Sequence, residues 1–182
     1  EKTATLRLNY HGRIDTNRNI TSLIEIFLRL KEIGKDVELN LHGGGSFVKK
    51  IKSLKFEGVN YTDNLNRKML AKKLSTYDVG FLPMPDTEVW RLSSPLKRSE
   101  YFASGMIVCG INHEGHQVED SGEWLRLFDE EEFIEGSVNW LKELKLKDIR
   151  GLQTEARIFA ERNLGWEHSI EILDQLIGKV SS

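Results

Sequence analysis

Apolar and polar residues along the chain form short alternating blocks, and these blocks are separated by stretches with helical spacing. The segment LRLNY (6–10) has the two-residue period of a strand, and the apolar positions between Ile20 and Leu30 have the period of an amphipathic helix. Five further segments have the composition and length of strands: VELNLH (37–42), LKFEGV (54–59), DVGFLP (78–83), MIVCGI (106–111) and LRLF (125–128).

Helical patterns lie between the predicted strands and after the last one. They cover 20–33, 48–54, 65–74, a segment that begins at Ser94, the residues after the acidic run DEEE (129–132), and two stretches within 148–179 that are interrupted at NLGW (163–166). Strands that alternate with helices indicate a mainly parallel sheet covered on both faces. The sequence therefore predicts an α/β, Rossmann-like three-layer domain with roughly six strands. Because no repeat or linker interrupts the pattern, residues 1–182 are predicted to form a single domain.

Composition narrows the choice of partner and environment. The chain has 182 residues and a formal net charge of −2, so it lacks the overall positive charge of nucleic-acid-binding proteins, and any polyanion would have to meet a local patch. A single cysteine, Cys109, cannot form an internal disulfide, which fits a reducing, cytoplasmic environment. No apolar stretch approaches the roughly 18 residues of a membrane span. The chain starts almost at its first strand without a methionine, so we expect a piece of a longer protein.

The segment RLSSPLKRSEYFASG (91–105) contains an unusual helix start. Ser94 is predicted as the N-cap and Pro95 as the first helical residue, which places Lys97 in the first turn. A cation is unfavourable there because the helix dipole is positive, whereas a bound phosphate would make Lys97 favourable. The alternative interpretation is that Lys97 is solvated or pairs with Glu100.

Two neighbouring features fit the same ligand. The loop HGRIDTNRN (11–19) follows the first strand and contains Arg13 and Arg18, whose guanidinium groups are suited to clamping a diphosphate. Glu100 lies within the predicted helix, where its carboxylate is suited to accept hydrogen bonds from the vicinal hydroxyls of a ribose. An ordinary basic loop is the alternative interpretation of the two arginines.

Other motifs give weaker signals. HGGGS (42–46) matches a dinucleotide-binding GxGxxG motif only in part, because Val48 stands where a glycine or alanine is required. His113 and His116 fall one residue short of the HExxH zinc spacing, and no metal site is predicted. The lysines between Lys49 and Lys73 have the spacing of solvated helix faces.

Six segments in order resemble the C-terminal, donor-binding domain of retaining GT-B glycosyltransferases of family 4, also called glycosyl transferases group 1. They are GRIDTNRN (12–19), VELNLHGGG (37–45), FEGVNY (56–61), STYDVGFLP (75–83), SPLKRSEYFASGMIV (94–108) and NLGWEHSI (163–170). The chain departs from the family pattern at Leu92, where the first glutamate of an E-x7-E motif is expected, and at Ile107, which replaces a common proline.

The resemblance implies roles for individual residues. Arg13, Arg18 and Lys97 would stabilise the departing diphosphate, with Arg18 in place of the family's usual lysine, and Glu100 would bind the ribose. Because Leu92 is apolar, contact with the donor sugar would shift to Glu88 or Asp86. The remaining donor-binding positions that the resemblance implies are Gly12, Gly44, Gly45, Tyr61, Ser93, Ser94, Pro95 and Leu96.

The function implied is transfer of a sugar from a nucleotide diphosphate sugar to a glycan, lipid or other acceptor, with retention of configuration and without a metal cofactor. The acceptor would be bound by an N-terminal domain outside these residues, so the isolated chain is expected to bind donor without turnover. No nucleic-acid partner is expected, and peripheral membrane contact of the full-length enzyme is compatible with this function. Two alternatives remain: a dinucleotide-binding domain of an oxidoreductase, and a non-catalytic nucleotide-binding or interaction domain.

Overall fold

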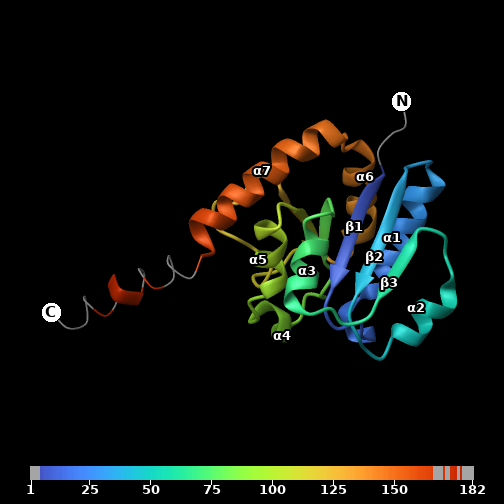
Figure 1. Cartoon of the computed structure of the whole chain (residues 1–182), viewed down its shortest axis with the longest axis horizontal. Helices are drawn as coiled ribbons and strands as arrows, with labels where there is room; N and C mark the ends of the chain where they lie inside the picture. The colour runs from blue at the N-terminus through green and yellow to red at the C-terminus, as the bar shows by residue number, and fades with distance from the viewer. Residues whose placement is uncertain (1–4, 166–169, 171–172, 176, 178–182) are drawn as a thin grey trace.

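A computed structural model describes residues 5–165, 170, 173–175 and 177, and its centre is an open sheet of parallel strands (Figure 1). The strand order is β3-β2-β1-β4-β5-β6, and every neighbouring pair is parallel, as the sequence predicts for this α/β, Rossmann-like domain. The strands are β1 (Leu6–His11), β2 (Val37–His42), β3 (Val59–Thr62), β4 (Val79–Leu82), β5 (Ile107–Ile111) and β6 (Leu125–Phe128).

Helices cover both faces of the sheet and give the three predicted layers (Figure 1). The helices are α1 (Ile20–Glu32), α2 (Val48–Leu54), α3 (Arg67–Leu74), α4 (Glu88–Arg91), α5 (Leu96–Ala103), α6 (Phe133–Glu143) and α7 (Leu146–Asn163), with a short 3₁₀ turn η1 (Thr16–Arg18). Helix α1 packs beside α6, and α5 packs beside α7. No helix in the described part of the chain is both long and apolar enough to cross a membrane.

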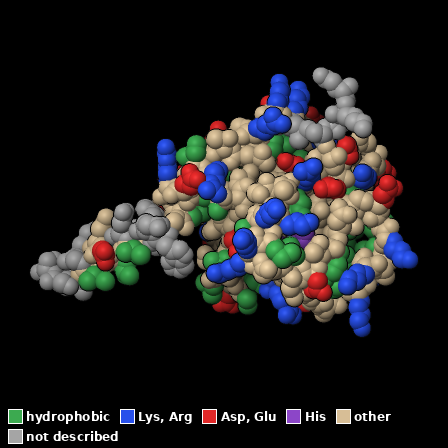
Figure 2. All heavy atoms as spheres, viewed as in Figure 1, with side chains coloured by type: hydrophobic (Ala, Val, Ile, Leu, Met, Phe, Trp, Pro, Cys, Tyr) green, Lys and Arg blue, Asp and Glu red, His purple; other side chains and the backbone are tan. Residues whose placement is uncertain are grey.

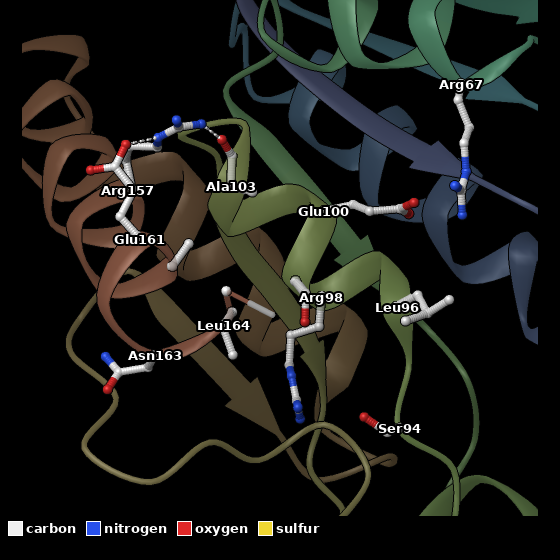
Figure 3. A pocket seen from close by; sticks show the side chains of 13 residues that line it. Arg67, Ser94, Leu96, Arg98, Glu100, Ala103, Arg157, Glu161, Asn163 and Leu164 are labelled. Atoms are coloured by element: carbon white, nitrogen blue, oxygen red, sulfur yellow. Dashed lines mark hydrogen bonds and ion pairs between the residues drawn. The ribbon is translucent and has the colours of Figure 1, made fainter. Parts of the chain in front are cut away.

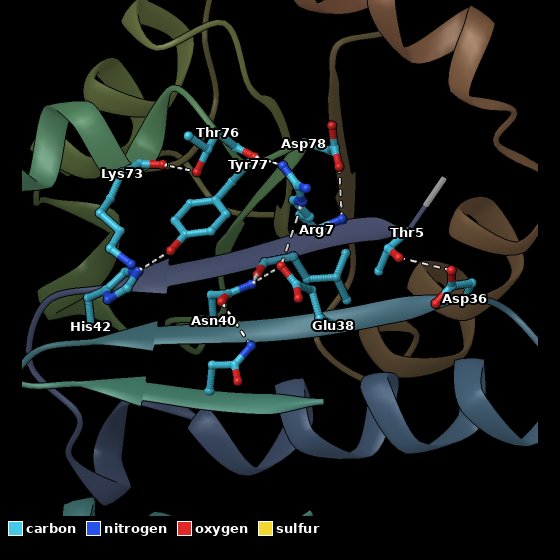
Figure 4. Close-up of polar contacts among 12 residues, drawn as sticks. Thr5, Arg7, Asp36, Glu38, Asn40, His42, Lys73, Thr76, Tyr77 and Asp78 are labelled. Carbon is cyan, nitrogen blue, oxygen red and sulfur yellow. Dashed lines mark hydrogen bonds and ion pairs between the residues drawn. The ribbon is translucent and has the colours of Figure 1, made fainter. Parts of the chain in front are cut away.

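The two-residue period of β1 and β2 separates an apolar from a polar face of the sheet. Leu8 pairs with Leu39 on one face and is buried, whereas Asn9 pairs with Asn40 on the other face and donates to its carbonyl oxygen at 3.1 Å. This polar face is linked by hydrogen bonds, for example from Asn60 to the Asn40 side-chain oxygen at 3.2 Å (Figure 4). The side-chain nitrogens of Asn9, Asn40 and Asn60 are therefore paired within the sheet, whereas Oδ1 of Asn9 has no hydrogen-bond partner among the described residues.

The structure corrects several predicted boundaries. Strand β3 begins at Val59 instead of lying within 54–59, because α2 continues to Leu54 and the chain turns at Gly58 with φ +89°. Helix α5 begins at Leu96, one residue later than predicted, with Pro95 as its N-cap and without a side-chain cap from Ser94. The short helix α4 was not predicted. The NLGW turn and the helix predicted after it lie largely outside the described residues.

Candidate functional site

The candidate site lies where the strand order reverses, between β1 and β4. The loops that follow these two strands diverge there, which opens a crevice beyond their carboxyl ends. The loop after β1 starts with Gly12, whose φ of +121° suits glycine and whose N–H donates to the His42 carbonyl at 2.9 Å. A Cβ atom at position 12 would lie 3.0 Å from Cε of Lys97, so the missing side chain leaves room for this lysine.

Lys97 extends from the first turn of α5 across the end of β1. Its Nζ lies 5.8 Å from the centre of the Tyr10 ring. Burial lowers the pKa of Lys97 from 10.5 to about 8, and the nearby charge of Arg18 adds to this effect. Within the described residues Lys97 forms no ion pair, so the alternative in which it pairs with Glu100 is not observed. The charge of Glu100 partly offsets these two effects on the pKa, but Lys97 has no direct carboxylate partner among the described residues.

Arg18 brings a second cation to the crevice and connects the two loops. It ends the 3₁₀ turn η1, and its guanidinium lies 4.7 Å from the centre of the Trp90 ring on α4. A cation–π contact holds the guanidinium in place but does not neutralise its charge. Lys97 and Arg18 therefore lie close enough for the charge of Arg18 to lower the pKa of Lys97.

Arg13 lies exposed in the loop after β1 and is paired with a carboxylate of the same loop. Its side chain is 69% exposed and its Nε lies 2.9 Å from Oδ2 of Asp15. The other Asp15 oxygen accepts hydrogen bonds from the backbone N–H of Ser46 at 2.7 Å and from the Ser46 hydroxyl at 3.0 Å. These bonds, the Ser46 N–H first and Arg13 second, lower the pKa of Asp15 to about 2. The charge of Arg13 is therefore already compensated at the outer rim of the loop.

Glu100 is positioned by a residue that sequence reasoning missed. Its Oε2 accepts a hydrogen bond from Nε2 of His11 at 2.7 Å, and this bond is the main reason that the pKa of Glu100 is lowered. The His11 side chain is only 7% exposed, whereas that of Glu100 is 44% exposed. The buried histidine therefore holds a carboxylate that solvent can still reach. Arg67 at the start of α3 points toward Glu100 and also lowers its pKa (Figure 3).

Glu100 lies at one end of a groove of about 570 Å³ between α5, α7 and the start of α3 (Figure 3). Ser94 and Leu96 line the same groove, and the Leu96 side chain is 72% exposed. Ala103 and Leu164 supply an apolar part of the wall. The groove therefore combines a charged end with an apolar wall, as is common in small-molecule sites.

The glycine loop after β2 supports the loop after β1. Gly43 has φ +136°, and a Cβ atom there would overlap the carbonyl oxygen of Gly12; a Cβ atom on Gly45 would overlap that of Ile14. A Cβ atom on Gly44 would meet only the Asn64 side chain, at 3.2 Å. At Gly43 and Gly45 the backbone of the glycine loop therefore packs directly against the backbone of the loop after β1.

Tyr61 on β3 is tied to the same glycine loop. Its hydroxyl donates to the Gly43 carbonyl oxygen at 2.8 Å. Nζ of Lys52 lies 4.8 Å from the centre of its ring. Both contacts hold Tyr61 beside the glycine loop, so its position depends on α2 as well as on β3.

The segment between β4 and α5 contains Leu92, at the position where the family pattern expects an acid, and the two acids considered as its substitutes, Asp86 and Glu88. The Leu92 side chain is 82% exposed. Asp86 binds Arg91 with both carboxylate oxygens, at 2.5 and 2.9 Å, whereas Glu88 lies exposed in the first turn of α4. Ser93 donates its hydroxyl to the Trp90 carbonyl oxygen at 3.0 Å. Of the two acids considered as substitutes, Asp86 is thus already paired.

His113 and His116 stack in a buried turn after β5. Their ring centres are 3.7 Å apart, and Nδ1 of His116 lies 2.7 Å from the Ile111 carbonyl oxygen. Burial lowers the pKa of both histidines, to about 3 for His116. In the part of the chain that the structure describes, no group of three or more His, Cys, Asp or Glu side chains is arranged to hold a metal ion.

Comparison with known proteins relates this architecture to solved glycosyltransferases. No family model and no curated protein sequence matches the chain. Three solved structures have a similar fold. They are the pneumococcal O-GlcNAc transferase GtfA (TM-score 0.72, 15% identity, 97% of this chain and 35% of GtfA), the catalytic domain of the Helicobacter pylori cholesterol-alpha-glucosyltransferase (0.68, 20%, 87% and 99%) and the C-terminal domain of the glycosyl transferase group 1 family protein LpcC from Francisella tularensis (0.66, 11%, 87% and 86%).

These coverages show which part of a glycosyltransferase the chain resembles. The chain spans about a third of the length of GtfA, and it is also similar over most of its length to the separately solved C-terminal domain of LpcC. The sequence identities are low, so the likeness concerns the fold. This chain has the fold of the C-terminal half of GT-B glycosyltransferases, as the sequence motifs predict.

Proposed function

We propose that this chain binds a nucleotide diphosphate sugar as the donor-binding domain of a retaining glycosyltransferase. The observation that carries the proposal is the pair of cations, Lys97 and Arg18, between the carboxyl ends of β1 and β4, neither of which forms an ion pair with a carboxylate among the described residues. A diphosphate would compensate both charges and would also accept hydrogen bonds from the free N–H groups in the first turn of α5. Burial and the nearby charge of Arg18 lower the pKa of Lys97, and a bound diphosphate would oppose both effects.

The nucleoside fits the adjacent end of the groove. The Glu100 carboxylate, held by His11 at 2.7 Å and partly exposed, would accept hydrogen bonds from the two ribose hydroxyls. Arg67 would then lie close to the same end and supply donors or a planar face to the nucleoside. The structures of GtfA and of Staphylococcus aureus TarM, which share this fold, were solved in complex with UDP, and this supports a nucleotide site in the fold.

In the proposed reaction the bond between the anomeric carbon and the diphosphate oxygen breaks, and the bonding electrons leave with the diphosphate. Lys97, Arg18 and the start of α5 would stabilise this charge while the acceptor oxygen bonds to the anomeric carbon from the same face and passes its hydroxyl proton to the departing diphosphate oxygen. The cations would make a metal ion unnecessary. Acceptor binding would require a further domain, so the isolated chain is expected to bind donor without transferring sugar.

Isothermal titration calorimetry with UDP, GDP, ADP and their sugar conjugates tests the proposal. We expect one nucleotide series to bind, and Lys97→Ala and Arg18→Ala to weaken binding about tenfold or more, since each removes a charge-assisted contact. Arg13→Ala should weaken binding less, because its guanidinium is exposed and paired with Asp15. Lys142→Ala, on an exposed turn of α6, is the control.

Titration with NAD alongside these nucleotides separates the two alternatives. Tight binding of NAD with no preference for a nucleoside diphosphate would favour the oxidoreductase domain. No binding by any nucleotide, with all variants indistinguishable from the parent chain, would overturn the proposal and favour an interaction domain.

A further inference from the structure

Positive charge is concentrated in one part of the chain. Residues 47–75 contain eight Lys and Arg side chains but only two acidic ones, Glu57 and Asp63, although the whole chain carries a net charge of −2. All eight cationic side chains are exposed, and in the described residues none of them forms an ion pair. We call this set, the Lys and Arg side chains from Lys49 to Lys73, the basic face. A solvated helix normally intersperses both signs of charge, so this distribution differs from an ordinary surface.

The basic face lies on α2 and α3. Helix α2 is beside the edge strand β3, whereas α3 lies in front of the sheet near β1 and α5 (Figure 1). Figure 2 shows Lys and Arg side chains over α3 and over α2 in the same view. Residues 112–135, which surround the opposite edge strand β6, contain nine acidic side chains and one basic side chain, Arg126. The molecule is therefore electrically polarised, and a negatively charged surface would attract it by the side that carries α2 and α3.

Exposed apolar side chains lie among these cations. Met69 on α3 is 53% exposed between Lys68 and Lys72, and Phe56, which follows α2, is 36% exposed. Lysines that extend their charge past exposed apolar side chains are typical of surfaces that enter the headgroup region of a bilayer. Single-stranded nucleic acids instead require several aromatic rings on which successive bases stack, but within residues 47–75 Phe56 is the one exposed aromatic side chain and the Tyr61 ring is already beside Lys52. Lipid is therefore the better fit of the two polyanionic partners.

We propose that the basic face binds an anionic lipid surface. The cations would lie at the headgroup phosphates, with Met69 and Phe56 directed into the interface and the acidic β6 edge directed away. The basic face shares only Arg67 with the proposed nucleotide site, which uses Lys97 and Arg18, so cations of this face other than Arg67 test the two proposals separately. Each cation near an anionic bilayer contributes about fivefold to the partition coefficient, so replacing three of them should weaken binding about 100-fold.

Vesicle co-sedimentation of the 182-residue chain tests this inference. The probes are vesicles of phosphatidylcholine alone and vesicles of phosphatidylcholine mixed with phosphatidylglycerol. The test variant is Lys50→Glu/Lys68→Glu/Lys72→Glu. The matched control, Lys142→Glu/Lys145→Glu/Lys147→Glu, makes the same change in net charge on exposed residues of and between α6 and α7. Circular dichroism and the thermal midpoint verify that both variants fold, and UDP and GDP titrations are run in parallel.

We expect the parent chain and the control variant to bind the anionic vesicles and not the neutral ones, and added salt should release them. The test variant should lose about two orders of magnitude in partition while its nucleotide binding is unchanged. Equal loss in both folded variants, binding to neutral vesicles, or binding to an oligonucleotide without binding to anionic vesicles would each overturn the inference. Failure of nucleotide binding alone would concern only the proposed function.

Discussion

Replacing Lys97 by methionine should stabilise the ligand-free protein and weaken nucleotide binding at the same time. Methionine keeps an unbranched chain over Gly12 and beside Tyr10 but removes the amine. In the absence of a ligand that amine is a poorly solvated charge near another cation, Arg18. With a diphosphate bound, the same charge is a partner of the ligand. The two measurements should therefore change in opposite directions.

The expected size follows from the pKa of Lys97. A decrease from 10.5 to about 8 corresponds to a cost of about 3 kcal/mol for keeping the amine charged in the folded state. The amine is partly accessible to solvent, which screens this cost, so we expect Lys97→Met to raise the free energy of unfolding by about 1–2 kcal/mol at neutral pH. The loss in nucleotide affinity should be about tenfold or more.

The pH dependence has a definite sign. Below about pH 8 the amine is charged in both the folded and the unfolded chain, and its full cost is present. Between about pH 8 and the ordinary value of 10.5 the folded protein releases the proton first, so the parent becomes more stable relative to Lys97→Met. Urea unfolding of both proteins at several pH values measures this difference, and calorimetry with the best-binding nucleotide measures affinity.

Lys142→Met serves as the control for the general effect of removing a lysine, since Lys142 is exposed on α6. Two results would refute the reasoning. One is that Lys97→Met unfolds more easily than the parent at neutral pH, and the other is that the stability difference stays constant as the pH rises. If Lys97→Met bound nucleotide as tightly as the parent, Lys97 would not be part of the donor site.

Three further measurements test other parts of the structure. Glu100→Gln should lower the free energy of unfolding at neutral pH by about 1 kcal/mol or less, because it removes the charged partner of His11. Urea unfolding should show that this difference vanishes as the pH falls through the lowered pKa of Glu100, since the parent then loses the same charge. Gly43→Ala should lower the thermal midpoint far more than Gly34→Ala, because only the former adds a backbone overlap to the strain of a positive φ; equal midpoints would contradict this. Burial raises the pKa of Cys109 to about 12, so a disulfide reagent should label it only after unfolding, and rapid labelling of the native chain would be inconsistent with the core.

Secondary structure was predictable where a period is long enough to be recognised. The strands VELNLH and LRLF have the bounds that their composition indicates, because each lies between clear turn residues. The third strand was placed too early because residues 54–57 alternate apolar and polar side chains as a strand does, although α2 continues to Leu54 and β3 begins only at Val59. Helix α4 has only four residues, fewer than two helical turns, so it presents no period.

The site was predictable where a residue contradicts its local environment. Lys97 near a helix N-terminus is unfavourable by itself, and this conflict indicated a ligand before any tertiary contact was known. The partner of Glu100 was not predictable in this way, because His11 is 89 residues away and has no unusual neighbour in the sequence. Arg13 was expected at the diphosphate, but Asp15, which Ser46 fixes from a separate loop, holds it at the rim. Such contacts follow from the approach of two loops and leave no local pattern.

The segment before α5 indicates how the proposed donor would be recognised. An acid at position 92 would place a negative charge near the donor sugar, but Leu92 is apolar and 82% exposed. Both carboxylate oxygens of Asp86 accept hydrogen bonds from the guanidinium group of Arg91, so they are less available to sugar hydroxyls. Glu88 is then the remaining acid of the two expected there, and it lies on a helix of one turn. Because the two unpaired cations lie at the diphosphate end, we expect most of the donor affinity to come from the nucleotide diphosphate and little from the sugar.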